Sequence, residues 1–459
     1  VLRIQPSAYL DKESIARALA AFDATFRAID DVAVDVLVGH LKQGGFRPPA
    51  APAAPAVLRG GRYGSEERIE RVGFLAHLID PQSVREWEPG LAGFDDEAIG
   101  ELKGRIQSTL EPHLIASRRV RSVLGREIEL RVYGIMMDSE SIELDIQFHR
   151  ARQVRQQVDR ACELAREDGC GLVGFGGYTS IVTGNCTSLG LEAPAVTTGN
   201  SLTVASSLAA ARRRYRRMGL DLSEATVAVV GATGNIGSVL GRLLAPLCAR
   251  LLLVGRTGGE ARIDRLIHEI ACDLLGRGPD GLDQPGFRAE QLTAWWRANR
   301  DPVPTSLARW MREKGWIAVA TDPLCCREAD IVFGTSSSSR PILTSSHFDR
   351  DRPVLVCDVA VPGDVDTTGL EQLSRLSLIR GGVVRLPMAP DFSLPGMQLA
   401  PGQIYACAAE TVLLGLAGIR ADFSKGAIRP QQVLEIAELA RLHGFEIDHE
   451  KRIGGFRSQ

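Results

Sequence analysis

The sequence predicts an α/β protein in which a doubly wound parallel sheet follows a smaller α/β domain and precedes carboxyl-terminal helices. From residue 226 onward, short apolar runs alternate with longer amphipathic segments. The runs at 227–230 and 353–356 are unbroken, as expected of parallel strands covered on both faces. A glycine-rich turn stands between the first of these runs and an amphipathic segment. These three observations are typical of βαβ units.

The composition is that of a globular protein with 459 residues, 44% hydrophobic and 24% charged residues, and a net charge of −2. We expect no transmembrane segment, because no apolar run reaches membrane-spanning length. The first residues lack a basic region followed by an apolar one, so we also expect no secretory signal and a cytoplasmic location. The net charge provides no general attraction to nucleic acid.

Nine cysteines are scattered along the chain, without a Cys-x-x-Cys pair or a Cys/His cluster. This pattern argues against a structural zinc site and against a disulfide framework. We therefore expect reduced thiols and no bound metal.

Residues 1–43 are predicted to be the carboxyl-terminal tail of an upstream domain, and residues 44–70 a Pro/Ala/Gly linker that cannot bury a core. The segments LRIQP at 2–6 and DKE at 11–13 resemble the carboxyl end of class III PLP-dependent aminotransferases. Any amphipathic terminal helix fits the same residues. The resemblance implies a PLP aminotransferase domain upstream in the same polypeptide.

Residues 71–204 are predicted to form the smaller α/β domain, which we expect to hold substrate and catalytic groups. Strands fit at 72–76, 128–137 and 171–177. Helices fit at 96–107, 111–118 and 148–168.

Residues 205–390 are predicted to form the doubly wound domain, and residues 391–459 a helical carboxyl-terminal segment. Strands fit at 226–231, 250–255, 317–320, 330–335, 353–359 and 376–384. Helices fit at 402–417 and 430–443. Four of the five tryptophans lie in an insert at 277–316, which we interpret as a packed helical cap. A partner-binding or membrane-surface patch is the alternative.

The turn GATGNIG at 231–237 carries the pattern Gly-x-x-Gly-x-x-Gly between a strand and a helix. Gly231 suits the tight turn, Gly234 lets the backbone approach a pyrophosphate, and Gly237 lets the helix pack on the strand. The helix start offers N–H groups to phosphates. The sequence therefore predicts a Rossmann dinucleotide site, and a glycine turn without a ligand is the alternative. Its predicted cofactor-binding residues are Gly231, Thr233, Gly234, Asn235, Ile236 and Gly237.

Arg256 and Thr257 follow the second predicted strand, where an acidic residue binds the ribose hydroxyls in NAD-dependent proteins. A guanidinium at this place matches the 2′-phosphate of NADPH, so NADPH is the predicted cofactor. A solvent-exposed arginine without a ligand is the alternative for Arg256. Thr335 and Ser336 end the fourth strand, where loops usually line the cofactor.

Cys407 is the candidate nucleophile. It lies in the first or second turn of a helix that follows Pro401 and Gly402, where the helix dipole should lower the pKa of a thiol. Glu410, one turn later, opposes that effect. A small core cysteine among Ala and Leu is the alternative interpretation.

Two polar loops precede the glycine turn. In the loop at 197–203, Thr198 and Asn200 are candidates for binding an oxyanion, and helix capping is the alternative role. In the loop at 176–180, the candidate substrate residues are Gly177, Tyr178, Thr179 and Ser180. His443 and His149 are candidates for the proton donor on chemistry alone.

Several separated motifs resemble the long-chain acyl-acyl carrier protein reductases best known from cyanobacteria. They are GGYTSI at 176–181, TTGNSLT at 197–203, ATVAVVGATGNIG at 225–237, GQIYACAAETVLL at 402–414 and HGFEI at 443–447. The resemblance implies that Cys407 accepts an acyl group from a thioester and that NADPH reduces the thioacyl enzyme to an aldehyde. It implies an acyl carrier protein or acyl-CoA as the donor. The basic stretch at 212–217 is a candidate docking site for an acidic carrier, or else a solvated helix face.

Two other functions fit parts of the sequence. One is an NADP-dependent alcohol or shikimate-type dehydrogenase without a covalent step. No Tyr-x-x-x-Lys pair is present, and the six lysines lie outside the motifs, which counts against it. The other is a non-catalytic NADPH-binding scaffold in a multienzyme assembly, which leaves Cys407 without a role.

Overall fold

The computed structural model describes residues 69–107, 110–190, 193–277, 287–299, 303–449 and 451–452. The predictions for residues 1–43 and for most of the linker at 44–70 lie outside the described residues. Within the described part, no helix is long and apolar enough to cross a membrane.

The amino-terminal half of the described residues forms a five-stranded sheet in the order β2-β3-β1-β4-β5. All neighbouring strands are parallel except β2 and β3. Its strands are β1 (Glu70–Leu78), β2 (His113–Arg121), β3 (Glu127–Asp138), β4 (Leu172–Phe175) and β5 (Ala195–Thr197). Its helices are α3 (Pro81–Trp87), η2 (Pro89–Leu91), α4 (Asp96–Ile106), α5 (Ser139–Gln147), α6 (Arg152–Glu167) and α7 (Tyr178–Val182).

One helix prediction in this half is wrong. The segment at 111–118 belongs to edge strand β2, whose buried residues Ala116 and Val120 are four positions apart. That spacing fits one face of a helix and one face of a strand equally, and antiparallel pairing with β3 decides between them. The helix predicted around 148–168 is confirmed as α6, which begins at Arg152 because the chain turns between α5 and α6 with a positive φ of 56° at His149.

The second sheet has seven strands in the order β14-β11-β10-β9-β6-β7-β8, parallel except for the short β14. Omitting β14, the chain runs outward from β6 to β7 and β8 on one side and to β9, β10 and β11 on the other. This is the Rossmann strand order, and it confirms the predicted α/β fold class. The strands are β6 (Thr226–Val230), β7 (Arg250–Val254), β8 (Ile317–Ala320), β9 (Ile331–Gly334), β10 (Val354–Asp358), β11 (Leu376–Arg380) and β14 (Lys451–Arg452).

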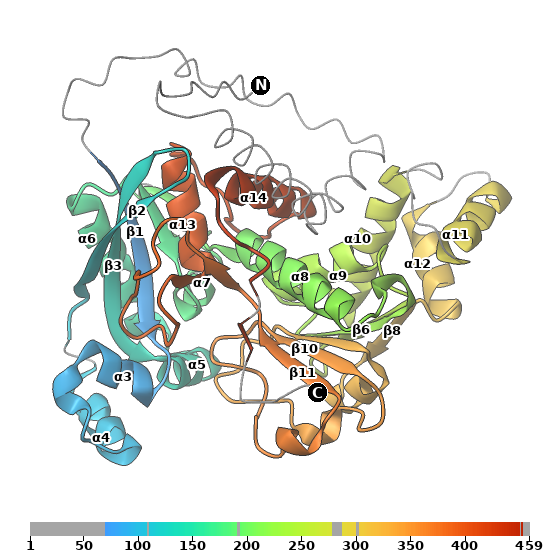
Figure 1. Cartoon of the computed structure of the whole chain (residues 1–459), viewed down its shortest axis with the longest axis horizontal. Coiled ribbons are helices and arrows are strands. Elements are labelled where there is room, and N and C mark those ends of the chain that lie inside the picture. Colours follow the sequence, from blue (N-terminus) through green and yellow to red (C-terminus); the bar gives the residue numbers. More distant parts are fainter. Residues whose placement is uncertain are drawn as a thin grey trace, which may run out of the picture.

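α-Helices cover one face of this sheet and join it to the first one, whereas short 3₁₀ helices and loops cover the other face (Figure 1). The largely buried α8 (Asn200–Arg217) leads from the first sheet to the second and packs against α9 (Asn235–Leu244). From the carboxyl end, α13 (Ala406–Leu416) returns to pack on β1 and β4, and α14 (Pro430–His443) packs on α8. One hydrophobic core therefore runs through both sheets.

The remaining elements are short or lie at the periphery. The Trp-rich insert carries the end of α10 (Glu260–Arg277), α11 (Phe287–Ala298) and α12 (Pro304–Glu313), so its described part is helical, as predicted. The rings of Trp295 and Trp310 lie 5.7 Å apart and those of Trp310 and Trp316 lie 4.9 Å apart. The other elements are η3 (Leu222–Glu224), η5 (Pro323–Glu328), η6 (Ser345–His347), η7 (Leu370–Gln372) and the hairpin of β12 (Val383–Arg385) and β13 (Gln403–Tyr405).

Candidate active site

A cavity of about 710 Å³ is lined by residues from both sheets. It reaches from the glycine turn after β6, past Cys407, to the carboxyl end of β1. The structure brings most of the predicted site residues to its wall. They are Gly177, Tyr178, Ser180, Thr198, Asn200, Gly231, Thr233, Gly234, Asn235, Ile236, Arg256, Thr335, Ser336 and Cys407. Thr179, Gly237 and Thr257 do not line the cavity.

The glycine turn is built as tightly as its sequence predicts. Gly231 has a φ of 82°, and a β-carbon there would lie 2.7 Å from the carbonyl oxygen of Thr335. A β-carbon on Gly237 would lie 2.4 Å from the carbonyl oxygen of Gly231, which explains why this residue packs beneath the turn and not along the cavity. Any side chain at either position would push α9 away from β6.

Asn235, the first residue of α9, ties the glycine turn to a loop far along the sequence. Its side-chain amide donates to the carbonyl oxygen of Gly426 at 2.9 Å, and its oxygen accepts from the N–H of Ile428 at 3.0 Å. The side-chain amide of Asn235 therefore holds the loop in place, while the backbone of Asn235 belongs to the helix start that faces the cavity.

Two arginines stand at the edge of the cavity beyond β7. Arg256 is exposed, and its Nη2 lies 3.5 Å from the hydroxyl oxygen of Ser337. Arg262, at the start of α10, also lines the cavity. Sequence reasoning missed Arg262 because it lies within a helix and not at the strand end. Thr257 is exposed and lies outside the lining.

A buried carboxylate fixes the turn after β9. Asp364 accepts hydrogen bonds from the N–H of Ser336 at 2.8 Å and from the Ser336 hydroxyl. Burial raises the pKa of Asp364 to about 6, although the bonds from Ser336 oppose that rise. The neighbouring Thr335 donates its hydroxyl to the carbonyl oxygen of Val230 at 2.6 Å. Asp364 was missed by sequence reasoning because it lies in an irregular loop after β10.

Cys407 is the second residue of α13, and its side chain is partly exposed toward the cavity. Burial, which was not predicted, has the largest effect on the pKa of this thiol, while the helix start lowers that pKa and Glu410 raises it, as predicted. Burial raises the pKa of the Cys407 thiol to about 12, and the nearby carboxyl of Glu410 raises it further. Hydrogen bonds from backbone N–H groups at the helix start lower the pKa, but they are outweighed by desolvation.

Glu410 lies one helical turn after Cys407 and is completely buried. It accepts a hydrogen bond from the hydroxyl of Thr197 and another from the N–H of Leu202 at 2.7 Å. Burial raises the pKa of Glu410. The carboxyl of Glu410 therefore holds the loop at 197–202 against the helix of the candidate nucleophile.

Thr198 and Asn200 differ in what they can offer to a substrate. The Thr198 hydroxyl donates to the carbonyl oxygen of Ser424 at 2.8 Å, and its N–H donates to the same oxygen at 3.0 Å. The Asn200 side chain lines the cavity and makes no hydrogen bond within the described residues. Asn200 thus retains a donor for an oxyanion, whereas the donors of Thr198 are already used.

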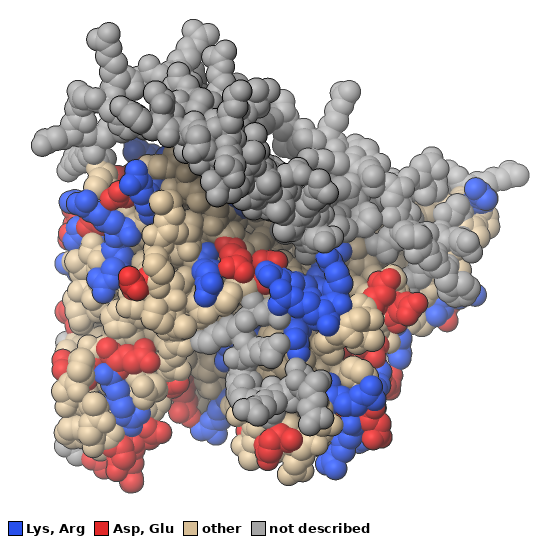
Figure 2. Space-filling view, viewed as in Figure 1, with Lys and Arg blue, Asp and Glu red and all other residues tan. Residues whose placement is uncertain are grey.

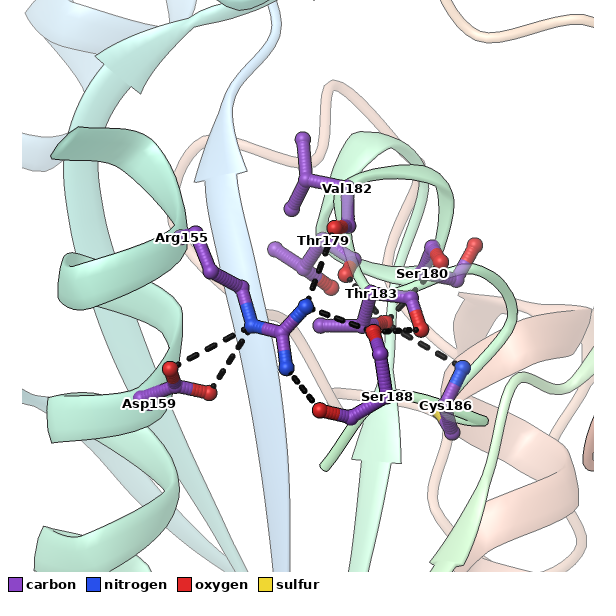
Figure 3. Close-up of polar contacts among 8 residues, drawn as sticks. All are labelled: Arg155, Asp159, Thr179, Ser180, Val182, Thr183, Cys186 and Ser188. Carbon is purple, nitrogen blue, oxygen red and sulfur yellow. Dashed lines mark hydrogen bonds and ion pairs between the residues drawn. The ribbon is translucent and has the colours of Figure 1, made fainter. Parts of the chain in front are cut away.

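The turn of α7 is anchored by a polar network (Figure 3). Arg155 of α6 donates to the hydroxyl oxygen of Ser188 at 2.6 Å and to the carbonyl oxygen of Val182 at 3.4 Å. The Thr183 hydroxyl donates to the carbonyl oxygen of Thr179 at 3.0 Å. Thr179 itself is buried and donates to the carbonyl oxygen of Gly176 at 2.9 Å, so it shapes the turn.

Tyr178 and His77 connect this turn to the rest of the site. The N–H of Tyr178 donates to Nε2 of His77 at 3.1 Å, and Nδ1 of His77 lies 2.7 Å from the carbonyl oxygen of Leu78. The Tyr178 hydroxyl donates to the carbonyl oxygen of Ser337 at 2.7 Å, which bridges the two sheets. Burial lowers the pKa of His77 to about 4.

His77 lines the cavity, whereas His443 and His149 do not. His443 is buried at the end of α14, and His149 is exposed between α5 and α6. The histidine in the site was overlooked, although its place directly after the predicted strand at 72–76 was a usable signal.

Only some of the side chains in the basic stretch at 212–217 are exposed at the surface. Arg214 is buried and donates to the hydroxyl of Ser377 at 2.8 Å, and Arg213 pairs with Asp448 at 2.8 Å. Figure 2 shows blue Lys and Arg side chains gathered on this face where Figure 1 places α8, with red acidic side chains beside them. Within the described residues, no group of three or more His, Cys, Asp or Glu side chains could hold a metal ion.

No protein-family model matches the sequence. The chain is 24% identical over 387 residues to a long-chain acyl-[acyl-carrier-protein] reductase of Synechococcus elongatus, covering 82% of this chain and 98% of that protein. It is 27% identical over 299 residues to aminotransferase PigE of a Serratia species. That match covers 64% of this chain but only 30% of the length of PigE.

Solved structures give only distant alignments. A methylenetetrahydrofolate dehydrogenase-cyclohydrolase of Trypanosoma brucei aligns at 12% identity over 81% of this chain and 86% of its own, with a TM-score of 0.29. A dipicolinate synthase of Bacillus subtilis aligns at 14% identity over 82% of this chain and 97% of its own, with a TM-score of 0.27. The fold is assigned from the strand order and not from these alignments.

Proposed function

We propose that this chain is an oxidoreductase that uses NADPH to reduce an acyl thioester to an aldehyde through a thioacyl enzyme on Cys407. The observation that carries the proposal is that Cys407 and the glycine turn after β6 line one cavity. The Rossmann strand order and the similarity to the cyanobacterial reductase support the oxidoreductase class. The acyl donor is an acyl carrier protein or acyl-CoA.

The wall of the cavity fits NADPH. Gly231 and Gly234 place no side chain at their positions in the turn, and the start of α9 offers N–H groups for the pyrophosphate. Arg256, with Arg262 beside the same edge, provides the positive charge for the 2′-phosphate. When bound, this cofactor supplies the hydride.

Cys407 carries the first half of the reaction. Its sulfur forms a bond to the thioester carbonyl carbon, the bond to the donor sulfur breaks, and the thiol proton leaves with the donor. Because the pKa of Cys407 is raised to about 12, the resting thiol is protonated, and its proton must move as the donor departs. The thioacyl group then accepts a hydride and a proton, which releases aldehyde and regenerates the thiol.

Asn200 is assigned to the oxyanion of both steps, since its side chain lines the cavity without a protein partner among the described residues. Thr198 is a positioning residue, because its hydroxyl and N–H hold the loop to Ser424. Tyr178 and Ser180 line the part of the cavity that we propose holds the substrate.

We further propose that an upstream PLP aminotransferase domain of the same polypeptide converts the aldehyde to an amine. The resemblance of residues 2–20 to an aminotransferase tail and the similarity to PigE support this idea. The full reading frame tests it: without a PLP-lysine domain before residue 1, the proposal is wrong.

The test of the reductase is mass spectrometry of the protein after incubation with an acyl thioester and no NADPH. The acyl mass should appear on the peptide that contains Cys407 and on no other. Cys407→Ser should bind NADPH but lose aldehyde formation by several orders of magnitude. Cys272→Ser is the matched control, because Cys272 is exposed and lies outside the cavity, and it should retain full activity.

Two outcomes would overturn the mechanism. Reduction by Cys407→Ser at near the original rate would favour direct hydride transfer without a covalent step, as in the alcohol and shikimate-type dehydrogenases. NADPH binding without any thioester reduction by the unmodified protein would favour the scaffold.

A further inference from the structure

The end of the cavity that the first sheet and α3 form is largely apolar. Apolar side chains from the first sheet, from the β1–α3 connection, from α3 and from the loop before β13 line it: Phe74, Ile79, Trp87, Ile115, Val132 and Met397. Phe74, Val132 and Met397 are buried, and the other three are partly exposed. Burying a hydrocarbon group against such a wall is favourable, whereas burying a polar or charged group there without a hydrogen-bond partner costs free energy.

We propose that this end holds an unbranched hydrocarbon chain of the thioester, and that Trp87 is the specificity-determining residue that limits its length. The inference rests on the proposed function, because the hydrocarbon must lie in the cavity that also holds Cys407.

Two glycines form a slot for the indole of Trp87. A β-carbon on Gly134 would lie 2.7 Å from Cζ3 of Trp87, and a β-carbon on Gly396 would lie 1.7 Å from its Nε1. Gly134 belongs to β3 and Gly396 to the loop before β13, so residues far apart in the sequence leave room for one ring. Neither position accepts alanine while Trp87 keeps its place.

Hydrogen bonds lock the ring in this slot. Nε1 of Trp87 donates to the carbonyl oxygen of Pro395 at 2.9 Å. The preceding carboxylate, Glu86, accepts from the N–H of Gly396 at 2.9 Å and from the N–H of Gln398 at 3.3 Å. The amide of Gln398 donates to Asp80 at 2.6 Å, just before α3. The loop at 395–398 is thus joined to both ends of α3.

A locked indole makes a firm end to an apolar cavity. Each methylene that a growing acyl group buries should raise kcat/KM about fourfold. An acyl group that reaches Trp87 can bury no further methylene without displacing a ring held by Pro395 and two glycines. The increase in kcat/KM should therefore stop abruptly at one acyl length instead of levelling off gradually.

The experiment measures kcat/KM for N-acetylcysteamine thioesters of straight-chain acids from butyryl to dodecanoyl. Trp87→Ala should move the optimum to a longer acyl group by at least two carbons, and Trp87→Phe should move it less. The NADPH affinity should not change, because Trp87 belongs to α3 beside the first sheet, whereas Arg256 follows β7 of the second sheet. Trp296→Ala is the control, since this tryptophan lies in α11 outside the cavity, and it should leave the optimum unchanged.

The results separate the two proposals. If the unmodified protein reduces none of the thioesters, the proposed function fails. If the unmodified protein reduces them but folded Trp87→Ala and Trp87→Phe keep its optimum, the role of Trp87 is wrong while the function stands. Should Trp87→Ala fail to fold, an unchanged optimum in Trp87→Phe alone overturns the inference.

Discussion

The α-carbon of Gly199 lies against the backbone of Cys407, and a β-carbon on Gly199 would come within 2.1 Å of the Cys407 α-carbon. Gly199 has a φ of 71°, and it precedes the first residue of α8, while Cys407 lies at the start of α13. The polar loop that carries Asn200 and the helix that carries the candidate nucleophile are therefore packed at backbone contact.

Gly199→Ala should separate Asn200 from Cys407 and abolish acyl transfer to the thiol. The overlap forces backbone to move, and a side chain at positive φ adds about 1 kcal/mol or more of strain. Acyl labelling without NADPH and thermal unfolding are the measurements. Gly219→Ala is the matched control: its φ of 77° gives the same strain, but nothing lies within 4 Å of the added carbon. Equal loss of labelling in both variants would contradict the role of the contact.

Arg256→Ala should weaken NADPH binding by roughly 1.5–3 kcal/mol, the usual contribution of a hydrogen bond to a charged group, and leave NADH nearly unchanged. Cofactor fluorescence titration provides both affinities. Thr257→Ala is the control, because Thr257 is exposed and lies outside the cavity wall. Equal affinity of the unmodified protein for the two cofactors would refute the assignment.

Glu410→Gln should lower the pKa of the Cys407 thiol, since the Glu410 carboxylate is one cause of its rise. The pH dependence of iodoacetamide alkylation should then shift to lower pH. Glu410→Ala should instead destabilise the fold by about 1–3 kcal/mol, because Thr197 and the N–H of Leu202 lose their acceptor. An unchanged alkylation profile in Glu410→Gln would mean that the Glu410 carboxyl is already protonated.

His77 should make the fold sensitive to acid. Its pKa is lowered from 6.5 to about 4 by burial, so between these values the unfolded protein binds a proton that the folded protein does not. Stability should therefore fall as the pH drops from 6.5 to 4, by up to roughly 3 kcal/mol from this group. Urea unfolding at several pH values measures the slope.

His77→Gln retains an acceptor for the N–H of Tyr178 and should flatten that slope. The comparison between the two proteins isolates His77 from Asp364. The pKa of Asp364 is raised to about 6, so its contribution has the opposite sign and is lost as the pH rises through that value. Identical slopes in the two proteins would show that His77 does not govern the acid response.

The parts of the fold that sequence predicts well are those that local pattern determines. The runs that became β6 and β10 are apolar throughout because both faces are covered, and Gly231 is required by a turn against Thr335. The sequence wrongly predicts a helix for edge strand β2, because its buried residues, Ala116 and Val120, have a spacing that is common to strands and helices.

The candidate site was less predictable, since it depends on residues that meet only in three dimensions. Asp364 and Trp87 have no motif around them, and their places in or beside the cavity follow from contacts with distant loops. The net rise in the pKa of Cys407 was not predicted, for the same reason. A helix start is visible in the sequence, whereas the degree of burial around it is not.

The hydrogen bonds of the Asn235 side chain limit how parts of this fold can be exchanged with those of other proteins. This side chain joins the glycine turn to Gly426 and Ile428, and the adjacent Ser424 holds Thr198 beside Cys407. The Rossmann half and the half that carries Cys407 are therefore not interchangeable modules with a boundary between them. A chimera that imports a foreign Rossmann sheet must carry the segment at 424–428 with it, or the graft will leave the two halves of the cavity out of register.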